Sequence, residues 1–539
     1  WYFLEGPQRI QELQVSPDGR WVLARSLAQQ LHVFPAPPGA GGDETPTVDL
    51  TDPQTVQQQI TRKGADFFGW ADGGRTITWA LGSTWYRCAL EPVTRETAAG
   101  VAGAGPLPER GCRSPESFDV PVEVPRDTPE GDLVLRGATV LTMNGDEAIE
   151  DADLHIRNDR IAAIGARGEL DLPSDTQVIS AAGRYIVPGF IETHIHLADI
   201  RRDVIEFASW GAAASLAYGV TSVFDPSSLS IDMLVYEDLV DAGLIVGARI
   251  HSTGPAIFDF HAFASPDEIR DVLLRYRDHY RTRNVKMYRT GNRRVRQWLA
   301  VEARDLGMLP TTEGALAMKL GLTQVLDGYM GLEHELAAQP LGHDVVELMA
   351  RSGAAYSPTL VISAGPDAEH WFIARDDPAS DPKMQRFWPG FARDWKLRHT
   401  TWHTFEEYSF PAAAAGAAEI FRAGGTVGVG AHGNIPGLGY QWEMQALAMG
   451  GMTPGEVLQA ATVHSARAIG RLAEFGTLEP GKYADLVVLE RDPREDIVNT
   501  LTIRQVMKNG RLYDGDTLDE IWPRQRAFPT PWYAEEELE

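Results

Sequence analysis

The chain has 539 residues, 43% of them hydrophobic, so it is long enough for two or three domains with large buried cores. Its formal net charge of −26 argues against nucleic acid or an anionic membrane as a partner, because both bind basic surfaces. The sequence has no apolar run of about 18 residues, so we expect no transmembrane helix and no membrane insertion.

Residues 1–120 have the pattern of a β domain with two similar turns. The segments 14–23 and 68–79 each place an Asp-Gly turn between strand-like, aromatic runs, as propeller blades do. This part resembles the end of a Tol-type periplasmic β-propeller. Two blades cannot close a propeller, so either further blades precede Trp1 or the fragment packs on the next domain. A small β-sandwich is the alternative.

The start of the chain and its cysteines bear on location. Trp1 is not a start methionine, so we expect a processed or truncated chain whose missing part could have carried an export signal. The two cysteines, Cys88 and Cys112, either form a disulfide, as in exported proteins, or stay separate thiols, since their spacing does not show proximity. We expect a periplasmic or extracellular location, with the cytoplasm as the alternative.

Residues 100–130, rich in Gly and Pro, look like a linker. The flanking segments 131–187 and 476–522 hold short strands. Between them, residues 188–475 alternate β-rich runs with helical ones, which predicts a parallel (β/α)8 barrel with its chemistry at the carboxyl ends of the strands. We place those ends near His196, Pro226, Thr253, Tyr288, Glu313, His334, Thr359 and His432.

The strongest motif is the pair His194 and His196 at the end of the apolar segment 186–195. Residues two apart on a strand point to the same face, so the two imidazoles converge. Neutral imidazole suits zinc and similar divalent metals. The pair therefore predicts a metal site, with ordinary hydrogen-bonded histidines as the alternative.

Further motifs accompany this pair on the expected second and fourth strands, at the end of the sixth and in the tail. They are Gly219–Val223, Val285–Tyr288, Glu333-His334 and the tail segment Gly476–Leu489. With them, residues 131–522 resemble a metal-dependent amidohydrolase of the imidazolonepropionase and prolidase-like branch. The resemblance implies a TIM barrel over 188–475, with a small composite β-sandwich built from 131–187 and 476–522.

The resemblance also implies the metal ligands. One or two divalent ions, zinc or else manganese or iron, would be held by His194, His196, Lys286, Glu313, His334 and His432. Lys286 lies on an apolar strand and would be carboxylated to bridge two metals, or else salt-bridged to a carboxylate. Glu313 stands where the family usually has a histidine, and it would be a ligand or a partner that orients a histidine.

His432 marks the clearest departure from the family. The segment Gly430–Gly433 replaces the usual Gly-Thr-Asp, whose aspartate takes the proton from metal-bound water. A histidine can move that proton, because its ordinary pKa is about 6.5, or it can serve as a further neutral ligand. We therefore expect His432 and Glu313 to carry the acid–base chemistry.

Several weaker candidates remain. His251, Tyr288 and Arg289 lie near strand ends and could contact substrate, with structural roles as the default; Arg289 could hold a substrate carboxylate. Asp225 reads as a turn residue. Residues 362–410 form a long aromatic insertion, which is either a lid or a local core with one or two aromatics at the pocket.

We thus expect an enzyme that hydrolyses amide-type C–N bonds with metal-activated water. The substrate would be a dipeptide, an N-acyl amino acid or a cyclic amide, and the prolidase-like resemblance favours peptides. Two rivals remain: a lyase or isomerase on the same metal-binding barrel, and a binding module of propeller and barrel without catalysis. A homo-oligomer is also compatible with the sequence.

Overall fold

The computed structural model describes residues 9–37, 48, 57–90, 115–197, 199–200, 204–228, 230–314, 317–362 and 365–536. It divides into two compact units. The first combines Trp1–Val124 with Ala256–Met308, and the second combines Pro125–Pro255 with Leu309–Glu539. No helix among the described residues is both long and apolar enough to span a bilayer.

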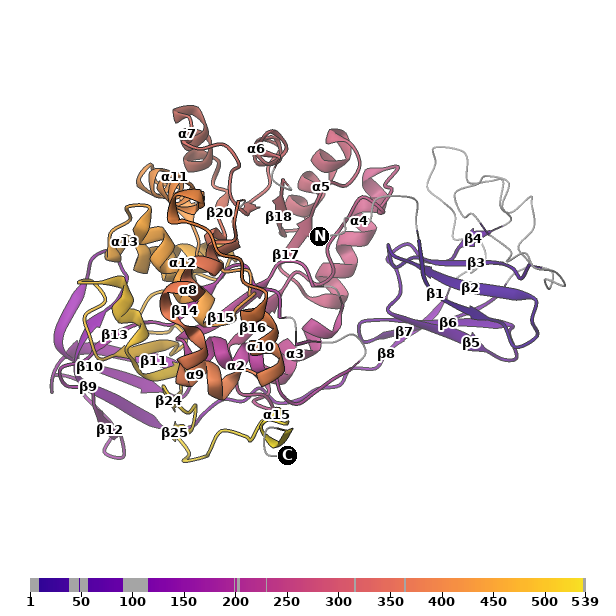
Figure 1. Cartoon of the computed structure of the whole chain (residues 1–539). Coiled ribbons are helices and arrows are strands. Elements are labelled where there is room, and N and C mark those ends of the chain that lie inside the picture. Colours follow the sequence, from indigo (N-terminus) through magenta and orange to yellow (C-terminus); the bar gives the residue numbers. More distant parts are fainter. Residues whose placement is uncertain are drawn as a thin grey trace. The chain divides into compact units, whose positions relative to one another are not determined.

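The amino-terminal part of the first unit holds two antiparallel sheets of four strands each, drawn in indigo in Figure 1. In both sheets the strands pair in chain order, and tight turns with positive-φ glycines, such as Gly19 and Gly73, join them. The strands are β1 (Ile10–Val15), β2 (Trp21–Ser26), β3 (Leu31–Pro35), β4 (Gln58–Gln59), β5 (Phe67–Ala71), β6 (Thr76–Leu81), β7 (Thr84–Ala89) and β8 (Glu116–Asp119). Each sheet has the strand order of a propeller blade, and the propeller itself stays a prediction.

The rest of the first unit is a β/α segment that contacts these sheets. Its elements are α4 (Pro266–Leu274), η2 (Arg275–Tyr280), β17 (Asn284–Met287) and α5 (Arg293–Asp305). The Tyr280 hydroxyl donates to a carboxylate oxygen of the buried Asp66, whose other oxygen accepts the Gly82 N–H over 2.8 Å. Arg62 pairs with Asp271 on α4. The β-rich fragment is therefore fastened to helices that follow it by about 200 residues.

The second unit contains a nine-stranded sheet built from two distant segments. The strands are β9 (Asp132–Leu141), β10 (Ala148–Arg157), β11 (Arg160–Ala166), β12 (Gln177–Ser180), β13 (Tyr185–Pro188), β22 (Leu486–Leu489), β23 (Ile503–Lys508), β24 (Arg511–Asp514) and β25 (Glu520–Trp522). The two segments join where β13 pairs antiparallel with β22, Ile186 opposite Val488. Figure 1 shows the purple and yellow strands together. The flanks of the predicted barrel thus share one sheet.

Seven parallel strands of the second unit follow the predicted β/α alternation. They are β14 (Phe190–Glu192), β15 (Val220–Asp225), β16 (Arg249–Ser252), β18 (Leu309–Glu313), β19 (Gly331–Glu333), β20 (Ala355–Ser357) and β21 (Thr426–Val427). β14, β15 and β16 form one parallel set and β18 to β21 another. A parallel bridge between Ile195 and His432 joins the two sets. Buried β-branched runs such as 220–223 explain these strands, because both of their faces are covered.

Helices cover these strands. They are α2 (Trp210–Ala217), α3 (Asp232–Asp241), α6 (Met318–Leu326), α7 (His343–Ser352), α11 (Phe410–Arg422), α12 (Leu438–Met449), α13 (Pro454–Gln459), η6 (Ala460–His464) and α14 (Ser465–Ala468). Local signals begin several of them: Ser209 caps α2, and Thr453 with Glu456 forms a capping box at α13. Two short elements, η7 (Ile497–Leu501) and α15 (Tyr533–Glu536), lie nearer the carboxyl end.

The predicted insertion is helical and divides its aromatic residues between core and surface. Its elements are η3 (Leu360–Ile362), α8 (Ala368–Asp376), η4 (Pro378–Ser380), α9 (Pro382–Phe387), α10 (Gly390–Arg398) and η5 (Phe405–Glu407). Phe372, Phe387 and Trp388 are buried in the main core, whereas Trp395 and Trp402 are 63% and 73% exposed. These buried aromatics therefore belong to the main core rather than to a separate local one.

Candidate functional site

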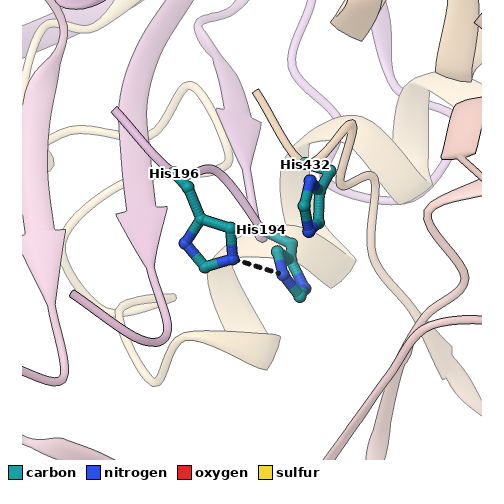
Figure 2. A group of neighbouring side chains, drawn as sticks. All are labelled: His194, His196 and His432. Carbon is teal, nitrogen blue, oxygen red and sulfur yellow. Dashed lines mark hydrogen bonds between the residues drawn. The ribbon is translucent and has the colours of Figure 1, made fainter. Parts of the chain in front are cut away.

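Four imidazoles gather at the carboxyl ends of the strands. His194 and His196 follow β14, His334 follows β19, and His432 follows β21. The ring centre of His194 lies 5.1 Å from that of His196, 4.7 Å from that of His334 and 5.1 Å from that of His432. Ligand atoms of His194, His196 and His432 lie within 4.8 Å of one another, and Figure 2 shows these three rings converging.

The backbone brings these residues together. The His432 N–H donates to the His194 carbonyl over 2.7 Å, and the His196 N–H donates to the His432 carbonyl over 3.1 Å. His432 and His334 both adopt left-handed backbone conformations, with φ of 64° and 67°. Such values are uncommon for residues other than glycine and are held by surrounding contacts at functional sites.

His194 and His196 are each oriented by a carboxylate. Nδ1 of His194 lies 2.9 Å from Oε2 of Glu333, and Nδ1 of His196 lies 3.0 Å from Oδ1 of Asp225. If both Nδ1–H groups donate, both Nε2 atoms carry lone pairs, and these two atoms lie only 3.3 Å apart. Two imidazole ligands of one tetrahedral zinc ion, with bonds of about 2.0–2.1 Å, stand about 3.3 Å apart. The pair therefore fits a shared cation.

His334 has partners on both ring nitrogens. Its Nδ1 lies 2.8 Å from the Thr359 hydroxyl, and its Nε2 lies 3.1 Å from Oε2 of Glu313. The Thr359 hydroxyl also lies 2.8 Å from the Pro358 carbonyl, so a hydroxyl that donates there accepts the Nδ1–H of His334. Nε2 of His334 then faces the Glu313 carboxylate, an arrangement that accommodates either a proton or a cation. Glu313 thus contacts the histidine cluster directly.

Burial decides the charge of His432. Removal from water lowers the pKa of His432 well below its ordinary value, and the neighbouring His196 and His334 act in the same direction. His432 is therefore a neutral imidazole, the form that binds metals. Its Nδ1 lies 3.3 Å from Oδ1 of Asn434.

A buried glutamate ties the two ligand-bearing strands together. One oxygen of Glu192 accepts the Ala431 N–H over 2.6 Å and the His194 N–H over 3.3 Å. Burial raises the pKa of Glu192 well above its ordinary value. Through these two hydrogen bonds Glu192 fixes the backbone that presents the imidazoles.

Two carboxylates that contact the histidines were not among the predicted site residues. Asp225 was read as a turn residue, and Glu333 was quoted only as the neighbour of His334, yet both orient histidines of the cluster. Asp225 does also accept the Ser227 N–H over 2.9 Å, as a turn residue would. Their positions could have identified them. Asp225 and Glu333 are the last residues of parallel strands, close to where the candidate metal ligands lie.

His251 lies away from the cluster, in contrast to its proposed contact with substrate. In the register of β15 and β16, Asp225 pairs with Ser252 and Phe224 pairs with His251, so His251 points away from the face that carries Asp225. Its ring stacks on Phe475 at 6.0 Å, and its Nδ1 lies 3.4 Å from Glu237. Burial lowers the pKa of His251 to about 3 and raises that of Glu237 to about 8, so both are neutral near pH 7.

The remaining predicted site residues, Lys286, Tyr288 and Arg289, belong to the first unit. Lys286 on β17 is fully buried, with Nζ 5.1 Å from the ring centre of Tyr288. Tyr288 is buried and Arg289 is half-buried. Because these three residues lie in a different compact unit from the histidines, the bridging role of Lys286 and the substrate contacts of Tyr288 and Arg289 stay predictions.

Part of the chain matches a known family model, and longer stretches are similar to known enzymes. Residues 408–513 match the amidohydrolase family model. Imidazolonepropionase of Symbiobacterium thermophilum is 27% identical over 432 residues, which cover 71% of this chain and 97% of that protein. An adenine deaminase of Rubrobacter xylanophilus is 34% identical over 182 residues, 31% of this chain and 29% of that protein. The chain thus spans less than a third of that deaminase.

Solved structures of a molinate hydrolase and a putative prolidase share the fold. A molinate hydrolase matches with a TM-score of 0.58 and 20% identity, covering 75% of this chain and 99% of that one. A putative prolidase from Bifidobacterium longum matches with a TM-score of 0.55 and 22% identity, covering 76% and 98%. These likenesses establish a TIM-barrel-like α/β fold. The family match and the likeness to imidazolonepropionase support a hydrolase that acts on carbon–nitrogen bonds.

Proposed function

We propose that this protein is a metal-dependent hydrolase of amide-type C–N bonds, with zinc as the first candidate metal and manganese or iron as alternatives. The observation that carries the proposal is the contact between His194 and His196, whose carboxylate-anchored rings bring two Nε2 atoms to 3.3 Å. When bound, a divalent cation supplies an activated water at neutral pH and polarises a substrate carbonyl.

We assign metal binding, ring orientation and proton transfer to different residues of the cluster. His194, His196 and His432 supply neutral imidazole nitrogens for the cation, while Asp225 and Glu333 hold the first two rings in the required tautomer. We assign to the Glu313–His334 pair, whose Oε2 and Nε2 atoms lie 3.1 Å apart, the role of accepting a proton from the attacking water and returning it to the leaving nitrogen. This role keeps Glu313 as the predicted acid–base residue and adds His334 as its partner.

The substrate stays at the level of a class. We propose a dipeptide, an N-acyl amino acid or a cyclic amide. The imidazolonepropionase that resembles 71% of this chain supports a cyclic substrate, and the likeness to the putative prolidase supports a peptide. Loops at the strand ends set such choices, and folds alone do not.

Metal analysis tests the proposal. Protein purified without chelators should contain zinc or a similar ion, should lose amide hydrolysis on chelation and should regain it with zinc, cobalt or manganese. His194→Ala and His196→Ala should remove both metal and activity, while His343→Ala, which changes an exposed histidine of α7, should change neither. Normal metal content and turnover in the first two variants would refute the site.

A lyase or isomerase on the same barrel is the rival enzyme class, and one assay separates it from a hydrolase. Turnover in ¹⁸O-labelled water should place the label in the product carboxyl group if a C–N bond is hydrolysed. A lyase or isomerase would give unlabelled product.

We also propose that the amino-terminal sheets are the last blades of a propeller and that the protein is exported. The two four-stranded antiparallel sheets support the first idea. Cys88 lies buried on β7, and Cys112 lies outside the described residues, so their predicted disulfide is part of this proposal.

A further inference from the structure

Hydrogen bonds through Asn434 link the insertion between β20 and β21 to the histidine cluster. Its Oδ1 lies 3.3 Å from Nδ1 of His432, and its Nδ2 donates to Oε1 of Glu369 over 3.4 Å. Glu369 is the second residue of α8 and is 2% exposed. The same oxygen accepts a hydrogen bond from the ammonium of Lys396 on α10.

The donor and acceptor groups fix the direction of each hydrogen bond from Glu369 through Asn434 to His432. A carboxylate paired with a lysine accepts hydrogen bonds and does not donate them, so the amide NH₂ of Asn434 must face Glu369. The amide oxygen of Asn434 then faces His432 and can only accept. The Nδ1 of His432 must therefore carry the proton, and Nε2 is the nitrogen that can bind a metal.

Glu369 also lies beside Asp367 and His370, a group whose ligand atoms fall within 4.8 Å of one another. The Lys396 ammonium already contacts the Glu369 carboxylate, and an added cation would be repelled by it. Glu369 is therefore better suited to accept hydrogen bonds from Lys396 and Asn434 than to bind a second metal ion.

We infer that Glu369 and Asn434 are positioning residues that hold His432 in the tautomer that binds the cation, so that the insertion sets the metal affinity of the site. This inference rests on the proposed metal-dependent function. It adds that α8 and α10 act on the site through hydrogen bonds rather than through contact with substrate.

Four variants test the series of hydrogen bonds from Glu369 through Asn434 to His432. Asn434→Leu removes both hydrogen bonds with little change of size. Asn434→Asp keeps an acceptor for His432 and breaks the link to Glu369. Glu369→Gln removes the charge that orients the amide, and Asn434→Leu combined with Glu369→Gln tests whether the two act in series. Asp367→Asn is the matched control, because Asp367 lies two residues before Glu369 at the start of α8, while Asn434 donates to Glu369.

Zinc affinity, measured by competition with a chelator, and the visible spectrum of the cobalt-loaded protein are the readouts. We expect Asn434→Leu to bind zinc about 10–100-fold more weakly, as is typical for residues that orient metal ligands, and Glu369→Gln to bind it about tenfold more weakly. The double variant should be no weaker than Asn434→Leu alone, and Asn434→Asp should retain nearly normal affinity. The cobalt spectrum should change in Asn434→Leu and stay unchanged in Asp367→Asn.

The outcomes separate this inference from the function on which it rests. If the native protein takes up no zinc, both fall. If zinc binding depends on His194 but not on Asn434 or Glu369, only the inference falls. If the effects of Asn434→Leu and Glu369→Gln simply add, the two residues act independently and the serial chain is wrong. Thermal unfolding of the metal-free variants shows whether each remains folded, and Glu369→Gln decides the matter if Asn434→Leu does not.

Discussion

Each histidine of the cluster is held through Nδ1, and the partner differs from ring to ring. Carboxylates hold His194 and His196, a hydroxyl holds His334 and an amide holds His432. Such partners fix both the tautomer and the orientation of a ring, which raises metal affinity without adding a ligand. The selection of residues around the site therefore extends beyond the histidines themselves.

Asp225→Asn tests this idea at one ring. Asparagine keeps the size and one acceptor oxygen but loses the charge that holds His196 as a good ligand. We expect zinc affinity to fall about 10–100-fold with the fold intact, as measured by chelator competition and thermal unfolding. Asp344→Asn, an exposed change on α7, is the control. An unchanged affinity in Asp225→Asn would mean that the contact does not orient the ring in solution.

His432→Ala distinguishes the two roles that the sequence left open. Because His432 lies within ligand distance of His194 and His196, we expect its loss to lower metal content together with activity. Metal analysis and steady-state kinetics on the same preparation check this. A variant that keeps its metal and loses about 10²–10⁴-fold in kcat would instead identify His432 as a proton shuttle.

Helix α12 holds a loop of the site in place through hydrogen bonds to one buried glutamate. Glu443 on α12 is fully buried, and its two oxygens accept the N–H groups of Leu360 and Val361 over 2.8 and 2.9 Å. These residues belong to η3, directly after Thr359, which contacts His334. The loop that holds His334 therefore depends on a carboxylate in the helix behind it.

This carboxylate makes stability depend on pH. Burial raises the pKa of Glu443 to about 8, above the ordinary value of 4.5. Its contribution to stability is therefore fully present below pH 4.5 and is lost as the pH rises through about 8. We expect the melting temperature of the native protein to fall by several degrees relative to Glu443→Gln between pH 5 and pH 9.

Melting curves of both proteins at several pH values check this prediction. A constant offset between them is expected as well, because glutamine replaces one acceptor oxygen with a donor. Only the change of the offset with pH reports on the ionisation of Glu443. A difference that does not vary with pH would show that Glu443 keeps one charge state throughout.

Much of this architecture could be predicted because its causes are local. Strand ends follow from apolar runs and turns, so His194, His196, His334 and Glu313 were placed at the correct strand ends from the sequence. The contacts of His194 with Glu333 and of His196 with Asp225 join residues 139 and 29 positions apart, and only the register of the parallel strands creates them. The link from Glu369 to Asn434 depends on how the insertion folds back, which no local pattern shows.

For the molecule as a whole, the division into units was not predicted. The sequence suggested a boundary near residue 120, whereas the β-rich fragment shares a compact unit with residues 256–308. Buried polar contacts such as that of Asp66 with Tyr280 cause this grouping, because each partner would be costly to bury alone.

The predicted disulfide between Cys88 and Cys112 tests whether the protein is exported. If the protein is exported, Cys88 and Cys112 should resist alkylation in the unfolded, unreduced protein and react only after a reductant is added. Mass spectrometry of the alkylated chain measures this. Two alkylated cysteines without reductant would contradict both the disulfide and the argument for export.

The shared sheet has a consequence for synthesis. β13 ends at Pro188, and its partner β22 begins at Leu486, roughly 300 residues later. At about 5–20 residues per second, a ribosome takes roughly 15–60 s to deliver the second strand after the first. During that time the edge of β13 that will meet β22 has no native partner, and exposed edges invite association with other chains. The nascent chain should therefore need chaperone protection until β22 has emerged.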